Sequence, residues 1–354
     1  LTGISQVILT CKVSLTMKTV NFCLVCLSVL MFASSSQSVK ARDTSRALSV
    51  THNSKQNVTP QTGKLVISPQ FNQAYPFSQG LAAVNIGDKW GYIDKTGKFV
   101  IPPQFKYAQS FSEGLAAVWN CNKSGYIDKT GKFIIRPQFE GGGSFSEGLA
   151  QAYIGGKSGY IDKTGKFVIR PQFDQAESFS EGLAATRIGD KWGYIDKTGK
   201  LVIRPQFDQA ESFSGGQAKV WINGGLRCID KTGKLIQPQF GDCALSFSEG
   251  LAAIDTTKEV ACNTVGFCRV GYIDKTGKMV IEPKFTGAKD FSEGLAPVAL
   301  YSNRDPALGV VIWPWVYIDK TAKVVISTEF EAATSFSEGL AAIKMGGKWG
   351  YISR

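Results

Sequence analysis

Carboxylates recur in this 354-residue chain at one place in a repeated motif. The motif is Ser-Glu-Gly-Leu, and its glutamates are Glu113, Glu147, Glu181, Glu249, Glu293 and Glu338. A ring of carboxylates could bind cations or hydrolyse glycosides. Glycoside hydrolysis requires two carboxylates in different environments, so that one is the acid and the other the base or nucleophile. Six equivalent glutamates do not supply that difference, so we expect turn residues that accept hydrogen bonds from nearby backbone.

Histidine chemistry is restricted to one residue, His52, which lies in a polar stretch near the N-terminus. A Ser-His-Asp triad or a multi-histidine zinc site would depend on it. A single histidine removes many mechanisms, and we expect no catalytic residue, no metal site and no cofactor.

Five cysteines remain after the export signal that we expect at the N-terminus. Because five is odd, at most two internal disulfides can form. The first candidate bridge, Cys262–Cys268, would brace a lengthened hairpin in an oxidising compartment. The second candidate is Cys228–Cys243, which leaves Cys121 without a partner. A metal site is disfavoured, since this region has no CxxC pair and no histidine to complete a site.

Lysines recur in the sequence IDKTGK, which occurs six times, with a seventh copy reading IDKTAK. Each copy carries one negative and two positive charges, so regularly stacked copies would make one edge basic. That edge could attract anionic polymers such as cell-surface glycans, phosphate-bearing envelope polymers or nucleic acid. The alternative, which we favour, is a solvated face that keeps the protein soluble. We expect no specific nucleic-acid binding, because the aromatic residues recur in strands and form no recognised nucleic-acid motif.

Two insertions break the repeat, at about residues 255–270 and 300–315. The second contains aromatic residues and an arginine, a composition typical of binding surfaces, and flat aromatic rings could also stack on sugars. The alternative is that this segment covers the core of a neighbouring unit. The candidate residues for binding a ligand or partner are Tyr301, Arg304, Trp313 and Trp315.

The spacing of these motifs is a repeat of 34 residues. The glycine of GYID lies at Gly91, Gly125, Gly159 and Gly193, and later spacings are longer where the insertions fall. The module from TGK to EGLA occurs eight times. A fixed period of this length indicates tandem supersecondary units stacked on one another.

Each unit predicts a three-stranded antiparallel meander with tight hairpins. In one copy the strands are Leu183–Ile188, Trp192–Asp196 and Lys200–Ile203. We expect Pro205 to end the third strand, because proline has no N–H to donate. No long segment shows a period of 3.6 residues, so we expect an all-β fold without helices.

The connection between units carries phenylalanines, such as Phe207 and Phe213, that recur in nearly every copy and should pack between units. In the IDKTGK turn, Gly199 can adopt the positive φ that closes a three-residue loop with a bulge. Asp196 can accept backbone N–H groups two residues on. Ala322 replaces this glycine in one copy, and that turn should be slightly strained or differently shaped.

The ends of the array favour a closed ring slightly over an open solenoid. The array begins with a lone third strand and ends with the first two strands of a unit. If Leu65–Ile67 pairs with Tyr351–Ile352, eight units close into a propeller-like ring without free edges. An open array is the alternative, although open arrays usually need polar caps and these terminal repeats look like the inner ones.

The sequence KWGYIDKTGKFVI, followed by PPQF and FSEGLAAV, resembles the WG-repeat (KWG-repeat) family of bacterial proteins over residues 61–354. The resemblance implies a β-rich repeat domain in proteins that are often exported, without an established catalytic activity or functional residues to carry over. Tryptophan and glycine occur together at Trp90, Trp192 and Trp349, whereas other copies replace one or both of them. We interpret these departures as degenerating copies.

The N-terminal segment predicts export. Lys18 precedes the apolar run Val20–Ala33, a pattern typical of a signal peptide and short for a membrane-spanning helix. We expect translation to start at Met17, with residues 1–16 an upstream extension, 17–41 a signal peptide and 42–60 a flexible leader.

The predicted function is therefore an exported, non-catalytic scaffold that is periplasmic, at the cell surface or secreted. Its partner would be a protein or an envelope glycan, with an anionic polymer as a further option, and no span would remain in the membrane after signal removal. One alternative is a carbohydrate-active enzyme with carboxylates where the repeat symmetry breaks. Another is a purely structural spacer.

Overall fold

The computed structural model describes residues 63–237, 247–255, 270–300 and 314–354. The chain divides into two units, Leu1–Thr59 and Pro60–Arg354, and all described residues belong to the second. These residues form strands and turns without a helix. Consequently, no described helix is available that would be long and apolar enough to cross a membrane.

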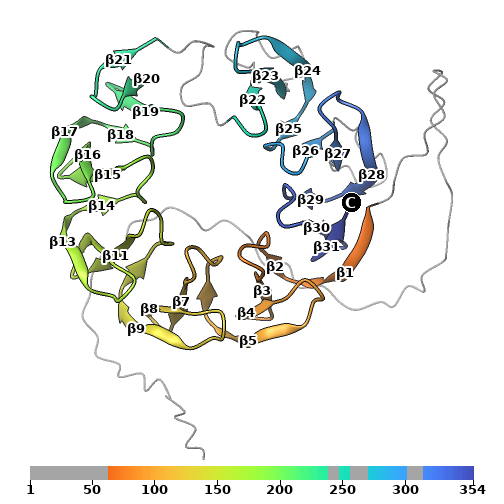
Figure 1. The fold of residues 1–354 in the computed structure, drawn as a ribbon, viewed down its shortest axis with the longest axis horizontal. Coiled ribbons are helices and arrows are strands. Elements are labelled where there is room, and N and C mark those ends of the chain that lie inside the picture. Colours follow the sequence, from red (N-terminus) through yellow and green to blue (C-terminus); the bar gives the residue numbers. More distant parts are fainter. Residues whose placement is uncertain (1–62, 238–246, 256–269, 301–313) are drawn as a thin grey trace, which may run out of the picture. The chain divides into compact units, whose positions relative to one another are not determined.

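The described strands form eight small antiparallel sheets arranged as the blades of a propeller (Figure 1). Blade 1 comprises β2 (Gln73–Ala74), β3 (Ala82–Ile86), β4 (Lys89–Ile93) and β5 (Phe99–Phe105). Blade 2 comprises β6 (Tyr107–Ala108), β7 (Ala116–Asn120), β8 (Lys123–Ile127) and β9 (Phe133–Phe139). Blade 3 comprises β10 (Gly141–Gly142), β11 (Ala150–Ile154), β12 (Lys157–Ile161) and β13 (Phe167–Phe173). Blade 4 comprises β14 (Gln175–Ala176), β15 (Leu183–Ile188), β16 (Lys191–Asp196) and β17 (Leu201–Phe207).

The other four blades continue the ring. Blade 5 comprises β18 (Gln209–Ala210), β19 (Gln217–Ile222), β20 (Gly225–Asp230) and β21 (Leu235–Ile236). The described strands of blade 6 are β22 (Leu251–Asp255), β23 (Val270–Asp274) and β24 (Met279–Phe285). Blade 7 comprises β25 (Gly287–Ala288), β26 (Ala296–Ala299), β27 (Trp315–Ile318) and β28 (Val324–Phe330). Blade 8 comprises β29 (Ala332–Ala333), β30 (Ala341–Met345), β31 (Lys348–Ser353) and β1 (Lys64–Phe71).

The three predicted strands of the meander are present in each blade, but most blades also contain a fourth. Among the described residues, seven of the eight sheets have four strands, because a two-residue strand such as β14 pairs with the first strand of the meander. The long third strands, such as β5, β9, β13 and β17, lie on the outside of the ring, and the short strands lie toward its centre (Figure 1).

The outer strand does not end at its proline, so that prediction was wrong. β17 includes Pro205 and continues to Phe207, which pairs with Trp192 across a bulge in the register. Proline is tolerated because this is an edge strand, whose unpaired side needs no N–H donor. The bulge also explains the glycine of GYID, since a Cβ on Gly91 would lie 2.6 Å from the carbonyl oxygen of Ile101.

Chain closure follows the predicted pairing. β1, from the start of the array, pairs antiparallel with β31 at its end, with Leu65 opposite Ile352 and Ile67 opposite Tyr351. The eighth blade is therefore built from both ends of the repeat array. The closed ring is confirmed, and the open solenoid was the wrong alternative.

The hydrophobic cores lie between neighbouring blades. One buried cluster joins blades 4 and 5 and contains Phe207 and Phe213, as predicted for the recurrent phenylalanines. A tyrosine from each GYID motif also crosses the interface: Tyr160 of blade 3 donates its hydroxyl to the carbonyl oxygen of Glu177 in blade 4, at 2.7 Å. A single blade cannot bury both of its faces, so the blades are stable only as neighbours.

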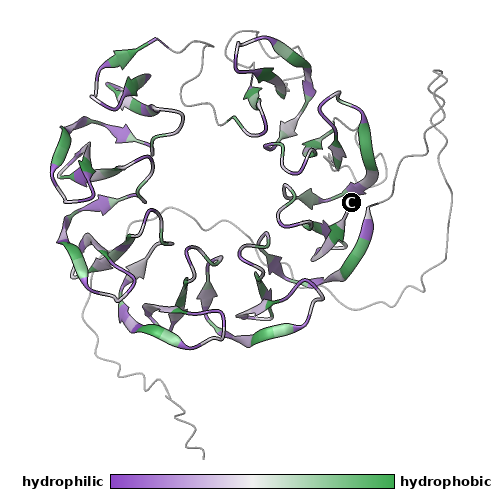
Figure 2. Cartoon of the chain, viewed as in Figure 1, coloured by the Kyte–Doolittle hydropathy of each residue, from purple (hydrophilic) through white to green (hydrophobic). Residues whose placement is uncertain are grey.

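Apolar residues also line the outside of the ring, where Figure 2 shows them along the outer strands. Val100, Ile134 and Val168 occupy the same position in β5, β9 and β13, and Val168 is 50% exposed. The prolines in these strands blunt the exposed edges against pairing with another chain.

Candidate functional site

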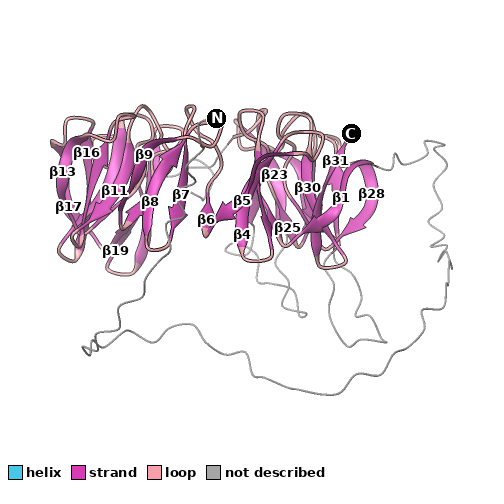
Figure 3. Ribbon diagram, turned by 90° about the horizontal axis from the view of Figure 1, so that it is seen from below, coloured by secondary structure: helices cyan, strands magenta, loops and turns pink. Residues whose placement is uncertain are grey.

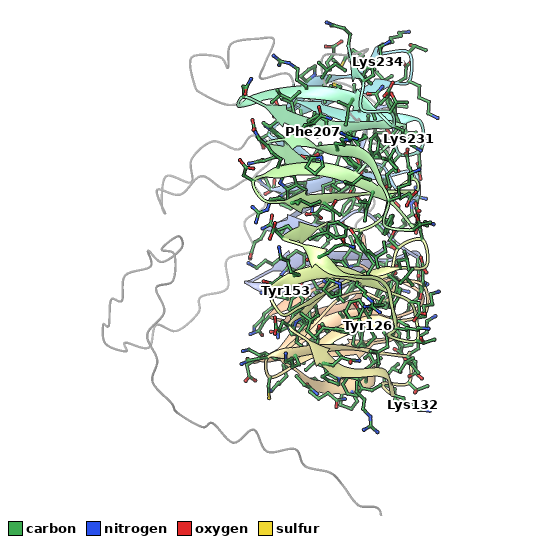
Figure 4. The ribbon with its side chains drawn as sticks, turned by 90° about the vertical axis from the view of Figure 1, so that its left-hand side faces the viewer. Tyr126, Lys132, Tyr153, Phe207, Lys231 and Lys234 are labelled. Atoms are coloured by element: carbon green, nitrogen blue, oxygen red, sulfur yellow. The ribbon has the colours of Figure 1, made fainter. Side chains whose placement is uncertain are left out.

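The strands place two kinds of turn at opposite ends of the blades (Figure 3). We call the side with the Asp-Lys-Thr-Gly-Lys turns the DKTGK face. We call the other side, with the tight turns between the first two strands of each meander, the hairpin face. Figure 4 shows Lys132, Lys231 and Lys234 of the DKTGK face along one edge, with Tyr153 toward the opposite side.

The DKTGK turns have the predicted geometry. Asp196 Oδ1 accepts the backbone N–H of Thr198 at 2.9 Å and that of Lys200 at 3.0 Å, and Gly199 has a φ of 87°. The turn at Ala322 has the same backbone hydrogen bonds with Asp319 but a φ of 63°. Its shape is therefore unchanged, and the strain of a positive φ remains.

The recurrent glutamates connect neighbouring blades. Both carboxylate oxygens of Glu147 in blade 3 accept the N–H of Gly182 in blade 4, at 3.1 and 3.2 Å. Glu147 also forms an ion pair with Lys197 of blade 4 at 3.0 Å. The Lys197 ammonium, together with this backbone N–H, holds the pKa of Glu147 below its usual value. These carboxylates thus accept backbone hydrogen bonds as expected, but the donor belongs to the next blade and not to the nearby backbone.

Ion pairs also reduce the positive charge expected on the DKTGK face. In five turns the first lysine contacts a glutamate of the preceding blade within 3.3 Å: Lys95–Glu338, Lys163–Glu113, Lys197–Glu147, Lys231–Glu181 and Lys320–Glu249. Because the carboxylates lie among the turns, this face alternates in charge and is less basic than the turn sequence alone implies.

On the hairpin face, the departures from Trp-Gly are compensated. Where serine replaces the tryptophan, the cross-strand partner is aromatic: Trp119 lies opposite Ser124, and Tyr153 lies opposite Ser158. Elsewhere the tryptophan faces a non-aromatic residue, as Trp90 faces Asn85. The aromatic ring has moved to the neighbouring strand, so these copies are not degenerate in their packing.

The predicted binding residues lie mostly outside the described residues. Tyr301, Arg304 and Trp313 are among those not described, so their grouping stays a prediction. Trp315 begins strand β27 and lies over the ammonium group of Lys289, whose Nζ is 5.4 Å from the ring. It is thus a partly buried strand residue. The sequence had instead indicated that Trp315 belongs to a long loop.

The structure describes only two of the five cysteines that follow the expected export signal, so only part of the disulfide prediction can be compared with it. Cys262, Cys268 and Cys243 lie outside the described residues. Cys228 is buried and disulfide-bonded. Cys121 is also disulfide-bonded, so the prediction that it lacks a partner was wrong.

Within the described ranges, no three His, Cys, Asp or Glu side chains converge as metal ligands would. The residues that flank the two insertions are paired at the hairpin face: Asp255 lies opposite Val270, and Ala299 lies opposite Trp315. The hairpin face is therefore where the repeat symmetry breaks.

A second departure from symmetry on this face was missed by the sequence analysis. Four aromatic side chains gather where blades 1 and 2 meet: Tyr75, Trp90, Tyr107 and Trp119. The available signal was that two of them, Tyr75 and Tyr107, stand at repeat positions that are not aromatic in other copies.

Comparison with known proteins settles the family. The model of the WG-containing repeat matches residues 61–90, 90–118, 125–157, 159–192, 192–224, 271–301 and 315–349. The chain belongs to the WG-repeat family. This WG-repeat protein has no match among curated proteins in a sequence search.

Solved structures are similar to this WG-repeat protein at low sequence identity. A eukaryotic initiation factor is 11% identical with a TM-score of 0.51, and the match covers 83% of this chain and 93% of that one. The WD40 domain of SCAP from fission yeast is 10% identical with a TM-score of 0.41, covering 83% and 96%. PorZ, a bacterial surface component of the type-IX secretion system of Porphyromonas gingivalis, is 8% identical with a TM-score of 0.37, covering 82% and 46%.

Proposed function

We propose that this WG-repeat propeller is an exported, non-catalytic binding scaffold of the cell envelope or the extracellular space. Its partner is a protein or an envelope glycan, including anionic polymers. The observation that carries the proposal is the difference between the two faces. The DKTGK face repeats the same links from blade to blade, whereas the hairpin face contains the residues that flank both insertions and the aromatic cluster of blades 1 and 2.

Binding is a better reading than catalysis because the carboxylates are engaged in structure. The glutamates that could have formed a catalytic pair accept backbone N–H groups from the next blade in equivalent settings. A glycosidase needs two carboxylates whose environments differ. A rigid ring with unlike features on one face is instead suited to recognising a partner.

Export is supported by the signal-like sequence of residues 17–41 and by the disulfides at Cys121 and Cys228, which are typical of oxidising compartments. The test is to express the protein from Met17 in a bacterial host and to sequence the N-terminus of the material outside the cytoplasm. We expect the mature chain to begin near residue 42. Recovery only in the cytoplasm, with residues 17–41 intact, would contradict export.

The binding role is tested with arrays of glycans and envelope extracts, probed with the exported protein. We expect retention that depends on the hairpin face, so a charge reversal there should reduce it. The matched control is Lys132→Glu, which changes an exposed lysine on the DKTGK face of blade 2 and should leave retention unchanged. Absence of any retained material would instead favour a structural spacer.

A further inference from the structure

Two tyrosines interrupt the repeat at the inner edge of blades 1 and 2. The residues equivalent to Tyr75 in the other described blades are Gln109, Gly143, Glu177, Glu211, Lys289 and Thr334. The residues equivalent to Tyr107 are Gln73, Gly141, Gln175, Gln209, Gly287 and Ala332. Because six blades fold with other residues at these positions, the propeller itself does not require either tyrosine.

The two tyrosines form a continuous aromatic cluster with two tryptophans. Tyr75 stacks on Trp90 with ring centroids 5.2 Å apart, and Trp90 forms an edge-to-face pair with Tyr107 with centroids 5.6 Å apart. The ring centroids of Tyr107 and Trp119 are in turn 5.1 Å apart. Trp90 is only 4% exposed and anchors the cluster, whereas Tyr107 is 37% exposed and Trp119 is partly exposed. The cluster thus presents aromatic surface to solvent from a fixed base.

The hydroxyl groups of this cluster differ from those of the GYID tyrosines. Each GYID tyrosine donates to a backbone carbonyl, as Tyr92 does to Gln109 at 2.8 Å. The Tyr75 and Tyr107 hydroxyls instead contact each other at 2.9 Å. In such a pair one hydroxyl donates to the other, so the accepting hydroxyl keeps its own proton for a further partner. The cluster therefore combines flat rings with a hydrogen-bond donor.

Lys89, beside the cluster, lacks the acidic partner that equivalent lysines of blades 3 and 4 have. In blade 4, Lys191 at the hairpin turn pairs with Asp208 of blade 5 at 2.6 Å, and Lys157 of blade 3 pairs with Asp174 in the same way. Lys89 of blade 1 corresponds to the lysine of these pairs, and Lys106 of blade 2 corresponds to the aspartate; both are exposed. The aspartate of the pair has become a second lysine.

The positions of these lysines follow from the backbone. Lys89 directly precedes Trp90 in β4. Lys106 directly precedes Tyr107, and its N–H donates to the carbonyl oxygen of Trp119 at 2.9 Å. Asp88, in the adjacent turn, is also exposed, so the three side chains carry a net charge of 2 − 1 = +1. Aromatic surface and excess positive charge therefore coincide at one place on the hairpin face.

From this coincidence we infer that the junction of blades 1 and 2 binds an anionic saccharide. A sugar ring stacks on Tyr107, whose ring lies edge to face with that of Trp119. The free tyrosine hydroxyl donates to a sugar oxygen, and Lys89 and Lys106 bind a carboxylate or phosphate group on the sugar. The inference rests on the proposed scaffold function and names its ligand class. Single-stranded nucleic acid is less suitable, since it requires a basic groove along its backbone and these two lysines do not extend into one.

The test measures the affinity of the full exported protein for four probes by calorimetry. The probes are a hexuronic-acid tetrasaccharide, its neutral methyl ester, a phosphorylated disaccharide and single-stranded oligothymidylate. We expect the acidic saccharides to bind at least about tenfold more tightly than the methyl ester, which is the effect of one charge-assisted contact. The preferred acidic probe identifies whether a carboxylate or a phosphate is recognised. Tighter binding of the oligothymidylate, or no binding of either acidic saccharide, would overturn the inference.

Two variants restore residues that the repeat uses elsewhere and therefore should fold. Lys106→Asp should weaken the acidic saccharides by about tenfold or more and leave the methyl ester unchanged. Tyr107→Gln should weaken all saccharide probes by about tenfold. Lys132→Asp, with the same charge change on the opposite face, should stay within about twofold. If the protein retains envelope material but neither Lys106→Asp nor Tyr107→Gln lowers affinity, this site is refuted while the scaffold function stands.

Discussion

Replacing Glu147 with alanine removes one complete link between blades 3 and 4. The Gly182 N–H loses a carboxylate at 3.1 to 3.2 Å, and Lys197 loses an ion pair at 3.0 Å. The hydrogen bond contributes about 0.5–1.5 kcal/mol. The ion pair joins side chains that are 29% and 45% exposed, so it adds only about 0.2–1 kcal/mol. We expect the free energy of unfolding to fall by about 1–2 kcal/mol.

A natural substitution supplies the matched control. Gln79 occupies the equivalent position in blade 1, and its amide oxygen accepts the N–H of Gly114 at 2.9 Å. Glu147→Gln should therefore keep the hydrogen bond and lose only the ion pair, at a cost of about 0.2–1 kcal/mol. Urea unfolding of the three proteins measures both differences, provided that the transition is cooperative.

The pH dependence gives an independent check. The folded protein lowers the pKa of Glu147 from its ordinary value of 4.5. Its contribution is therefore fully present above that value and is lost as the pH falls through the lowered pKa. The difference between wild type and Glu147→Ala should narrow in acid. Equal losses for Glu147→Ala and Glu147→Gln at neutral pH would refute the role of the backbone hydrogen bond.

Three further predictions follow from the same interfaces. Gly91→Ala should lower the free energy of unfolding by about 3 kcal/mol, because its Cβ would lie 2.6 Å from the Ile101 carbonyl oxygen. Gly80→Ala has open space around it but a φ of 88°, so it should cost only about 1–2 kcal/mol in the same urea unfolding assay. Tyr160→Phe should lose about 1 kcal/mol in the same assay, because it removes the 2.7 Å hydrogen bond to Glu177, and an unchanged midpoint would contradict this link. Burial raises the pKa of the GYID tyrosines above their ordinary value of 10.0. Their contribution to folding stability is therefore complete below pH 10 and is lost as the pH rises through the folded pKa. Thermal melts should show the melting temperature falling in alkali as phenolate absorbance appears.

The sequence was sufficient for features that one repeat unit contains by itself. The hydrogen bonds of Asp196 and the positive φ of Gly199 span five residues, so local turn chemistry specified them. Ring closure was also accessible, because a lone third strand at one end complements two strands at the other.

Features that depend on a neighbouring blade could not be predicted from the sequence. The acceptor role of Glu147 was expected, but its donor lies 35 residues away in the next blade. The short strand β14 has no strand-forming composition and pairs only because the chain returns beside β15. The extension of β17 through Pro205 required knowing that it would be an edge strand.

The candidate site was missed for a related reason. Tyr75 and Trp90 are 15 positions apart in the sequence, and Tyr107 belongs to the next repeat. Their contact follows from the packing of blade 1 against blade 2, which repeat spacing alone does not provide.

The central claim is that the two ends of the repeat array pair to close the ring. Lys64 lies opposite Ser353 in the pairing of β1 with β31. In a Lys64→Cys/Ser353→Cys variant, mild oxidation should therefore form an intramolecular disulfide, detected by peptide mass spectrometry of the monomer. The control is Lys64→Cys/Lys278→Cys, which places the second cysteine at the equivalent turn of blade 6 and should not cross-link. A cross-link only between separate molecules, or none at all, would contradict the closed ring.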